Sequence, residues 1–266
     1  MLKSVTGSVR QRIEELQLAF ALLTRFPVPR GKLKTRARLT TAFWAYPIAG
    51  AAVGCFGAQV FWLAHRLEVG DVPAVVLALS AMTLATGAFH EDGLADFWDA
   101  IGGGKNRQHK LSIMRDSRLG TYGVIALILY FALNIFLLTE IYERLNAESV
   151  IHVMICLAIL ARLSFVIPIL SLYPARQDGL AVAAATPPLV SVAFGFLFFI
   201  GISTYLLGVW LTCVVCVGAA FGAVPISMMA YYYLRGYTGD VLGATAMTSQ
   251  STALIAVLIG MSVIAQ

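Results

Sequence analysis

Long apolar runs alternate with short polar segments along most of this chain. Runs of about bilayer-spanning length fall near residues 42–64, 73–89, 121–142, 151–172, 189–207, 209–232 and 251–265, the last being short. An α-helix needs about 17–25 apolar residues to cross the hydrocarbon core of a membrane. The pattern therefore predicts an all-α fold, a polytopic membrane bundle of about seven transmembrane helices. We expect residues 1–266 to form a single integral membrane domain.

The N-terminal segment, residues 1–41, differs from the rest because it is polar and basic. Residues 13–29 within it are amphipathic, which favours an interfacial helix lying on the membrane surface. Only 12% of the chain is charged, about half the share of a soluble domain, so a soluble fold is disfavoured.

Lysine and arginine are distributed unevenly between alternate loops. With the N-terminus inside, the inside segments hold sixteen of these residues and the outside segments hold two, Arg66 and Arg144. Cytoplasmic loops carry such an excess, so the N-terminus and the loop 90–120 are predicted to be cytoplasmic. Topology accounts for most of the +5 net charge, and we infer no nucleic-acid partner from it.

Four carboxylates, Glu91, Asp92, Asp96 and Asp99, fall within nine residues of a chain that has only fourteen acidic residues. If the stretch is helical, the spacing i, i+4, i+7 places Asp92, Asp96 and Asp99 on one face. Like charges so placed repel each other, and hard oxygen ligands suit Mg²⁺, with Mn²⁺ as the alternative. We therefore expect these four residues to be metal ligands. The competing interpretation is a solvated acidic helix end.

Cations follow the acidic run. Three glycines, 102–104, precede Lys105 and are consistent either with a phosphate cradle or with a flexible loop. Arg115 and Arg118 are three residues apart and can each grip a phosphate with two hydrogen bonds. Asp116 between them can complete a metal site or orient an arginine. The alternative for this segment is flanking charge that only sets the topology.

Two more polar residues lie in apolar surroundings. Asp240 is the one carboxylate in the last 85 residues, and glycines surround it between two predicted spans. Glycine-broken backbone at membrane depth usually lines a cavity, so a ligand role is favoured over a simple turn. Arg162 lies midway along the fourth span and is a functional hypothesis by default, against a structural ion pair or a side chain that reaches the interface.

Five motifs together resemble one known family, the cobalamin synthases (adenosylcobinamide-GDP ribazoletransferases). They are Leu23–Pro29, His90–Asp96, Asp99, Ile113–Gly123 and Gly239–Ala244, in the family's order and at fitting spacings. The chain departs from the family pattern at two places. Ala100 stands where glycine is expected, and Thr248–Gln250 stands where a trailing glutamate is expected, which puts a fifth carboxylate ligand in doubt.

The resemblance implies a multi-pass enzyme of the cell inner membrane with its active site on the cytoplasmic face. It would join adenosylcobinamide-GDP to α-ribazole, or to α-ribazole 5′-phosphate, and release GMP with Mg²⁺. Membrane lipids are further expected partners, and an oligomer is left open. On this interpretation the catalytic residues are Glu91, Asp92, Asp96 and Asp99, with Glu91 or Asp96 as the base. The substrate-binding residues are Lys105, Arg115, Asp116, Arg118, Arg162 and Asp240.

Two rival functions remain at this point. One is another membrane phosphotransferase or prenyltransferase that uses aspartate-bound Mg²⁺. The other is a divalent-cation transporter, in which the acidic run would form an ion gate.

Overall fold

A computed structural model describes residues 2–29, 39–179 and 186–264, and these are largely helical, with an isolated bridge between Pro174 and Tyr237. The elements are α1 (Leu2–Leu23), η2 (Thr41–Ala45), α2 (Tyr46–Arg66), α3 (Asp71–Thr86), α4 (Phe89–Gly103), α5 (Arg107–Ile113), α6 (Thr121–Arg144), α7 (Ala147–Leu163), α8 (Val166–Ser171), α10 (Leu189–Leu234) and α11 (Gly239–Ile264). The prediction of an all-α fold is confirmed. Residue 1 and residues 30–38 of the predicted basic segment lie outside the described residues.

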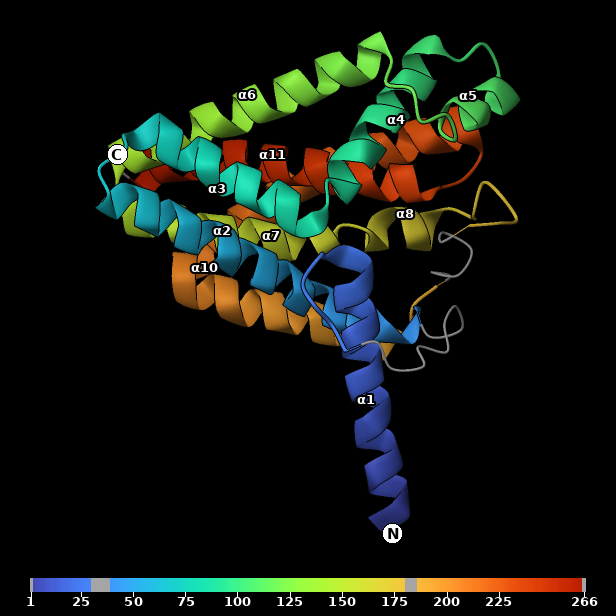
Figure 1. The fold of residues 1–266 in the computed structure, drawn as a ribbon, viewed down its shortest axis with the longest axis horizontal. Coiled ribbons are helices and arrows are strands. Elements are labelled where there is room, and N and C mark those ends of the chain that lie inside the picture. The colour runs from blue at the N-terminus through green and yellow to red at the C-terminus, as the bar shows by residue number, and fades with distance from the viewer. Residues whose placement is uncertain (1, 30–38, 180–185, 265–266) are drawn as a thin grey trace.

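Long helices run side by side and form a bundle, while α1 projects from its side, roughly across the direction of those helices (Figure 1). Five helical stretches are long and apolar enough to cross a membrane: Thr41–Arg66, Thr121–Arg144, Ala147–Ser171, Leu189–Leu234 and Gly239–Val263. The bent pair α3 and α4 adds a sixth if it counts as one span. The chain is therefore a polytopic membrane protein, as predicted.

The helix α10 is a hairpin with its tip at Gly208. This residue has a non-helical backbone, with φ 81° and ψ 167°. The hydroxyls of Ser203 and Thr212 share a hydrogen bond of 2.9 Å, whereas nine residues of a continuous helix would separate them by about 13.5 Å along its axis. Because the two arms fold back on each other, the predicted boundary between spans 189–207 and 209–232 is correct.

The last span begins earlier than predicted. Residues 235–250 were expected to form a glycine-broken loop before a short span at 251–265, but α11 is one helix from Gly239. The glycines in its first turns do not interrupt the helix. One of them, Gly243, lies at a close contact with α4, where a side chain would not fit without a shift. The expected interfacial helix 13–29 also differs in extent, since α1 covers Leu2–Leu23.

The first helix is attached to the bundle by a buried acid. The indole N–H of Trp44 donates a 2.8 Å hydrogen bond to Glu15. Glu15 also accepts from Arg12 at 2.8 Å, and its side chain is buried. This contact places the C-terminal end of α1, including Leu22 and Leu23, at the same end of the bundle as α4.

Helix α7 lies in the middle of the bundle, where α2 packs closely against it. A Cβ atom added to Gly50 would lie 2.5 Å from the carbonyl oxygen of Ala158, and one added to Gly54 would lie 2.8 Å from Cα of Ile155. Small residues are typical of such contacts in membranes, where close packing replaces the hydrophobic effect between helices.

We expect Gly50→Val to lower the free energy of unfolding by about 1–3 kcal/mol, since overpacking at a fixed helix contact costs about this much. The matched control is Gly201→Val in α10, because a Cβ there meets nothing within 4 Å. Thermal unfolding of the purified protein in detergent measures both. An equal loss in the two variants would contradict the packing described for α2 and α7.

Candidate active site

The acidic run lies on α4, which turns sharply away from α3. The two helices meet at 88°, so α4 does not continue in the direction of α3. The turn uses two left-handed residues, Gly87 with φ 68° and Ala88 with φ 57°. Glycine adopts this conformation without steric cost. Gly87 also leaves room for the side chain of Arg25, which occupies the position a Cβ would take.

Helices α4 and α11 cross at a pair of glycines. A Cβ on Gly93 would lie 3.1 Å from Cα of Asp240, and a Cβ on Gly243 would lie 3.0 Å from the carbonyl oxygen of His90. The two helices therefore approach to backbone contact. This crossing brings Asp240 beside the acidic run, although about 140 residues separate them in the sequence.

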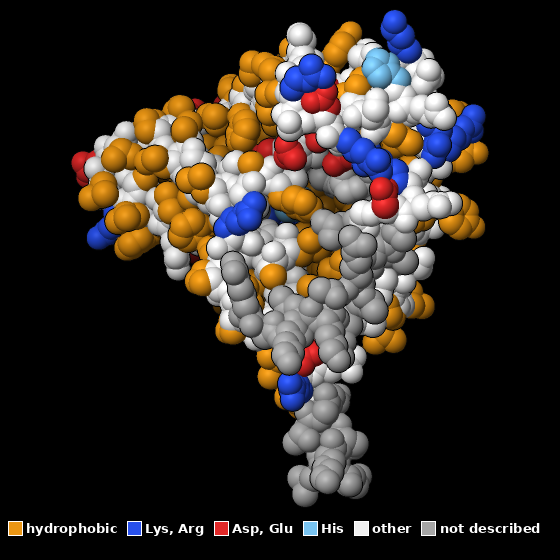
Figure 2. Space-filling model, turned by 45° about the vertical axis from the view of Figure 1, so that its right-hand side comes forward, with side chains coloured by type: hydrophobic (Ala, Val, Ile, Leu, Met, Phe, Trp, Pro, Cys, Tyr) orange, Lys and Arg blue, Asp and Glu red, His pale blue; other side chains and the backbone are white. Residues whose placement is uncertain are grey.

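A cavity of about 360 Å³ opens beside the crossing. Four carboxylates line it: Asp92 and Asp96 from α4, Asp240 from α11, and Asp116 from the segment between α5 and α6. The remaining lining residues belong to that same segment, Met114–Leu119. Figure 2 shows acidic and basic side chains gathered around a hollow in this surface. Of the ten predicted site residues, six line this cavity: Asp92, Asp96, Arg115, Asp116, Arg118 and Asp240.

The carboxylates in this cavity raise one another's free energy when charged. Burial, together with the charges of Asp92, Asp240 and Asp99, raises the pKa of Asp96 to about 7. The positive charge of Arg176 opposes this shift at Asp96. Its guanidinium donates to the carbonyl of Leu111 at 2.7 Å. The cavity therefore carries excess negative charge, which favours a bound cation.

The donor set fits a hard divalent cation that the substrate helps to hold. Among the described residues, no three acidic, histidine or cysteine side chains are close enough to enclose a metal ion. Mg²⁺ is commonly bound through only one or two carboxylates, with phosphate oxygens and waters completing its shell. Carboxylates from two helices around an open cavity meet that requirement.

Both predicted phosphate-binding arginines lie at the cavity, and each is paired with a carboxylate. Arg115 donates to both oxygens of Asp178 at 2.7 Å, and Arg118 donates from Nε to both oxygens of Asp116 at 3.0 and 2.9 Å. All four side chains reach solvent. Asp116 therefore orients an arginine, which was one of its two predicted roles.

Asp99 does not face this cavity, contrary to the expectation that it is a metal ligand. Its two oxygens accept hydrogen bonds from the backbone N–H groups of Gly120 at 2.7 Å and Gly123 at 2.8 Å. These are unpaired donors at the beginning of α6, and a carboxylate there also interacts favourably with the helix dipole. Asp99 thus fixes the start of α6 to the last turns of α4.

Glu91 and Arg162 also lie elsewhere, in a separate cavity inside the bundle. Glu91 is 8% exposed and accepts a 3.1 Å hydrogen bond from Thr83, while Arg162 is 2% exposed and donates to the carbonyl of Ala158. Neither Glu91 nor Arg162 therefore lines the cavity that Asp92 and Asp96 line. Gln250, at the place of the expected trailing glutamate, lines this inner cavity and not the acidic one.

Lys105 is exposed in the turn between α4 and α5 and does not line the acidic cavity. The glycines before it are not a phosphate cradle, since Gly102 and Gly103 belong to α4. A side chain at position 102 would collide with the ring of Tyr122, which packs against Gly102. The glycine run, for which the sequence left a phosphate cradle and a flexible loop as alternatives, is therefore a helix end.

The family described as cobalamin-5-phosphate synthase matches residues 15–258. The chain belongs to the cobalamin-5-phosphate synthase family. A relative from Bradyrhizobium diazoefficiens is 38% identical over 251 residues, which are 94% of this chain and 95% of the relative. A relative from Mesorhizobium japonicum is 35% identical over 265 residues, 98% of this chain and 99% of the relative. Both are named adenosylcobinamide-GDP ribazoletransferase. No solved structure matches the chain.

Two residues beside the acidic cavity are not indicated as site residues by the sequence. Arg176 is the lone cation of the segment 173–188, where it contributes only to the loop charge that predicts the topology. Thr238 donates a 3.1 Å hydrogen bond to Asp240 and begins the turn into α11. The threonine two residues before an isolated aspartate was a usable signal, whereas nothing in the sequence linked Arg176 to the acidic run.

We expect Asp99→Ala to lower the free energy of unfolding by about 2 kcal/mol or more, because two hydrogen bonds to a charged group are lost. Asp178→Ala is the control, since its ion pair is exposed and contributes at most about 1 kcal/mol. Chemical unfolding in detergent without divalent cations measures both. If Asp99→Ala unfolded like Asp178→Ala, the anchoring role would be refuted.

Proposed function

We propose that this protein transfers the adenosylcobinamide phosphate group from adenosylcobinamide-GDP to α-ribazole or its 5′-phosphate, and releases GMP. The names of relatives that match nearly the whole chain support the reaction. The observation that carries it is structural. Carboxylates from two crossing helices, Asp92, Asp96 and Asp240, share one cavity with the arginines Arg115 and Arg118.

The chemistry requires charge neutralisation more than covalent help from the protein. The ribazole hydroxyl attacks the phosphorus that carries the cobinamide, and the bond from this phosphorus to the GMP oxygen breaks. Negative charge gathers on the phosphate oxygens during this step. Arg115 and Arg118 bind those oxygens, exchanging their pairing with Asp178 and Asp116 for the substrate. Exposed ion pairs contribute at most about 1 kcal/mol, so this exchange costs little.

Mg²⁺ is the cofactor that this proposal implies, with Mn²⁺ as its substitute. Asp92 and Asp240, one from each crossing helix, would hold it together with diphosphate oxygens of the substrate. The ion would neutralise the charge that develops on the transferred and leaving phosphates. Thr238 orients Asp240 for this contact by donating a hydrogen bond to it, and the charge of Arg176 favours its ionised form.

Asp96 accepts the proton of the attacking hydroxyl in this proposal. A pKa of about 7 suits a general base at neutral pH. The sequence left Glu91 and Asp96 as alternatives for this role. Asp96 is favoured because it lines the acidic cavity, whereas Glu91 lines the inner one.

We also propose that the site faces the cytoplasm from the inner membrane. Among the described residues, the five cations between Lys105 and Arg118 lie in α5 and the turns beside it, next to the site, while Arg66 and Arg144 end α2 and α6 at the opposite end. Such an asymmetry is typical of the cytoplasmic side. Exposed apolar side chains on the long helices, such as Leu129 and Phe136 of α6, are suited to contact with membrane lipids.

We expect Asp92→Asn, Asp96→Asn and Asp240→Asn each to lower kcat/KM by about 10²-fold or more, the usual cost of removing one electrostatic contact to a transition state. The measurement is GMP release by the purified protein given Mg²⁺, adenosylcobinamide-GDP and α-ribazole. Glu68→Gln is the control, an exposed acid in the connection between α2 and α3 at the opposite end of the bundle. Activity like that of the wild type in all three aspartate variants would rule out the proposed site.

A further inference from the structure

Two members of the acidic run lie outside the acidic cavity, and in the sequence they bracket the two that line it. Glu91 precedes Asp92 on the first turn of α4, and Asp99 follows Asp96 towards the end of the helix. The first N–H groups of α6 hold Asp99 in place. Glu91 lines the inner cavity instead. It is therefore placed to act as a second anchor, at the beginning of α4.

The inner cavity is small and lies where six helices meet. Side chains from α2, α3, α4, α6, α7 and α11 line it. Its volume is about 20 Å³. One ordered water needs about 10–15 Å³, so the cavity holds a water molecule and is too small for a phosphate group or a nucleoside. Its two charged lining residues, Glu91 and Arg162, have opposite signs, so the cavity favours neither a cation nor an anion.

Several buried polar atoms at this cavity lack a hydrogen-bond partner among the described residues. They are one oxygen of Glu91, Nε of Arg162 and both ring nitrogens of His90. The charges of Glu91 and Arg162 act on each other, yet their hydrogen bonds go to Thr83 and to the carbonyl of Ala158. A buried polar atom without a partner is unfavourable. An occupant that both donates and accepts hydrogen bonds is therefore stabilised here.

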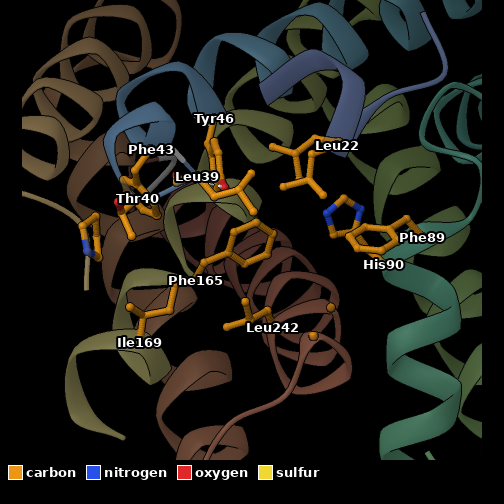
Figure 3. Close-up of a pocket in the computed structure, with 14 residues that line it drawn as sticks. Leu22, Leu39, Thr40, Phe43, Tyr46, Phe89, His90, Phe165, Ile169 and Leu242 are labelled. Atoms are coloured by element: carbon orange, nitrogen blue, oxygen red, sulfur yellow. Dashed lines mark hydrogen bonds between the residues drawn. The ribbon is translucent and has the colours of Figure 1, made fainter. Parts of the chain in front are cut away.

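The ring of His90 stands between the inner cavity and an apolar pocket, because it lines both. This apolar pocket measures about 40 Å³ and includes Leu242 and Gly243 of α11. The imidazole stacks on Phe165 with ring centroids 5.7 Å apart and meets Phe89 edge-on at 5.5 Å (Figure 3). These aromatic contacts hold the imidazole in place, and the inner cavity keeps its shape on this side.

We propose that an ordered water molecule in the inner cavity bridges Glu91 to Arg162 and thereby fixes the first turn of α4 to α7. A buried water makes about three hydrogen bonds. This one donates to the Glu91 carboxylate and to a ring nitrogen of His90, and it accepts from Nε of Arg162. Glu91 and Arg162 are then positioning residues for Asp92. The positioning role rests on the function proposed above, whereas the water bridge does not.

The bridge determines how α4 is rotated about its own axis. The contact of α4 with α11 is made by Gly93, which has no side chain to resist a rotation. With Glu91 held inward, Asp92 points about 100° away around the helix, towards the acidic cavity. Asp96 lies one turn further on the same face. The bridge at one end and Asp99 at the other therefore direct both cavity carboxylates.

The first test is direct observation of the water. A crystal structure of the full chain, grown from a lipid mesophase at a resolution that shows ordered water, should place a water at about 2.7–3.2 Å from both Glu91 and Arg162. A cavity without water, or a carboxylate and guanidinium in direct contact, would overturn the bridge. This test needs no variant and no substrate.

The second test removes the two charges singly and together. Glu91→Leu leaves the charge of Arg162 buried without its counterpart, and Arg162→Met does the reverse. An unpaired buried charge is strongly destabilising, whereas replacing both partners by apolar groups is often neutral. Each single variant should lower the thermal midpoint by about 5 °C or more. Each should lower kcat per folded molecule by about tenfold or more, since a small displacement of catalytic groups is costly.

The double variant should recover much of both losses, with kcat at least about threefold above that of either single variant. Such recovery is impossible for a catalytic base or a metal ligand, because the second substitution does not restore a carboxylate. The matched control is the pair Glu140→Leu and Arg144→Met on α6, which breaks a more exposed ion pair of 2.7 Å. Exposed pairs contribute little, so these variants should stay close to the wild type.

The outcomes separate the bridge from the reaction. Single variants that keep the wild-type kcat per folded molecule would overturn the positioning role. A double variant as inactive as Glu91→Leu would also overturn it, because Glu91 would then act in the chemistry itself. If the wild type releases no GMP, the proposed function fails and the positioning role fails with it. The crystal structure and the thermal midpoints still decide the water bridge in that case.

Discussion

The backbone contact between α4 and α11 is the constraint on which the site depends. Gly93 and Gly243 allow the two helices to approach so closely that any side chain at either position would have to displace backbone atoms. The acidic carboxylates and the apolar pocket both owe their positions to this contact. Asp92 and Asp240 are thereby brought to the same cavity.

Several polar contacts hold α4 in this position. Asp99 binds the first N–H groups of α6, and Lys110 donates to the carbonyl of Ile101 near the end of α4. Arg107 donates at 2.7 Å to the carbonyls of Leu234 and Ala175. Charged side chains that look available for substrate in the sequence thus stabilise backbone, and such charge-assisted hydrogen bonds are strong where water is scarce.

The sequence predicted the parts of this structure that follow from local pattern. Apolar runs located the spans, including the α10 hairpin at Gly208, because burial in lipid imposes a length on each helix. Helical spacing correctly joined Asp92 to Asp96. It failed for Asp99 because the approach of α6, a tertiary event, occupies that carboxylate. Glu91 precedes Asp92 by one residue, which is a rotation of about 100° around the helix, and it therefore faces the interior.

Glycine was the least predictable residue type. The glycines near Asp240 indicated a loop by propensity, yet they form a helix because the neighbouring helix α4 needs the space. The glycines before Lys105 indicated a phosphate cradle, yet they end α4 against Tyr122. In each case the role of the glycine depends on the helix or side chain that packs against it. A single sequence does not reveal which segment packs there.

The most direct test of the account is whether one divalent cation depends on both crossing helices. Electron paramagnetic resonance of Mn²⁺, titrated into the nanodisc-bound protein with adenosylcobinamide-GDP present, reports the bound ion. Loss of a carboxylate ligand at a shared site should weaken Mn²⁺ binding by about tenfold or more. The account predicts this loss for Asp92→Asn and for Asp240→Asn alike, with Asp99→Asn retaining the ion. Binding of Mn²⁺ that is unchanged in Asp240→Asn would contradict it.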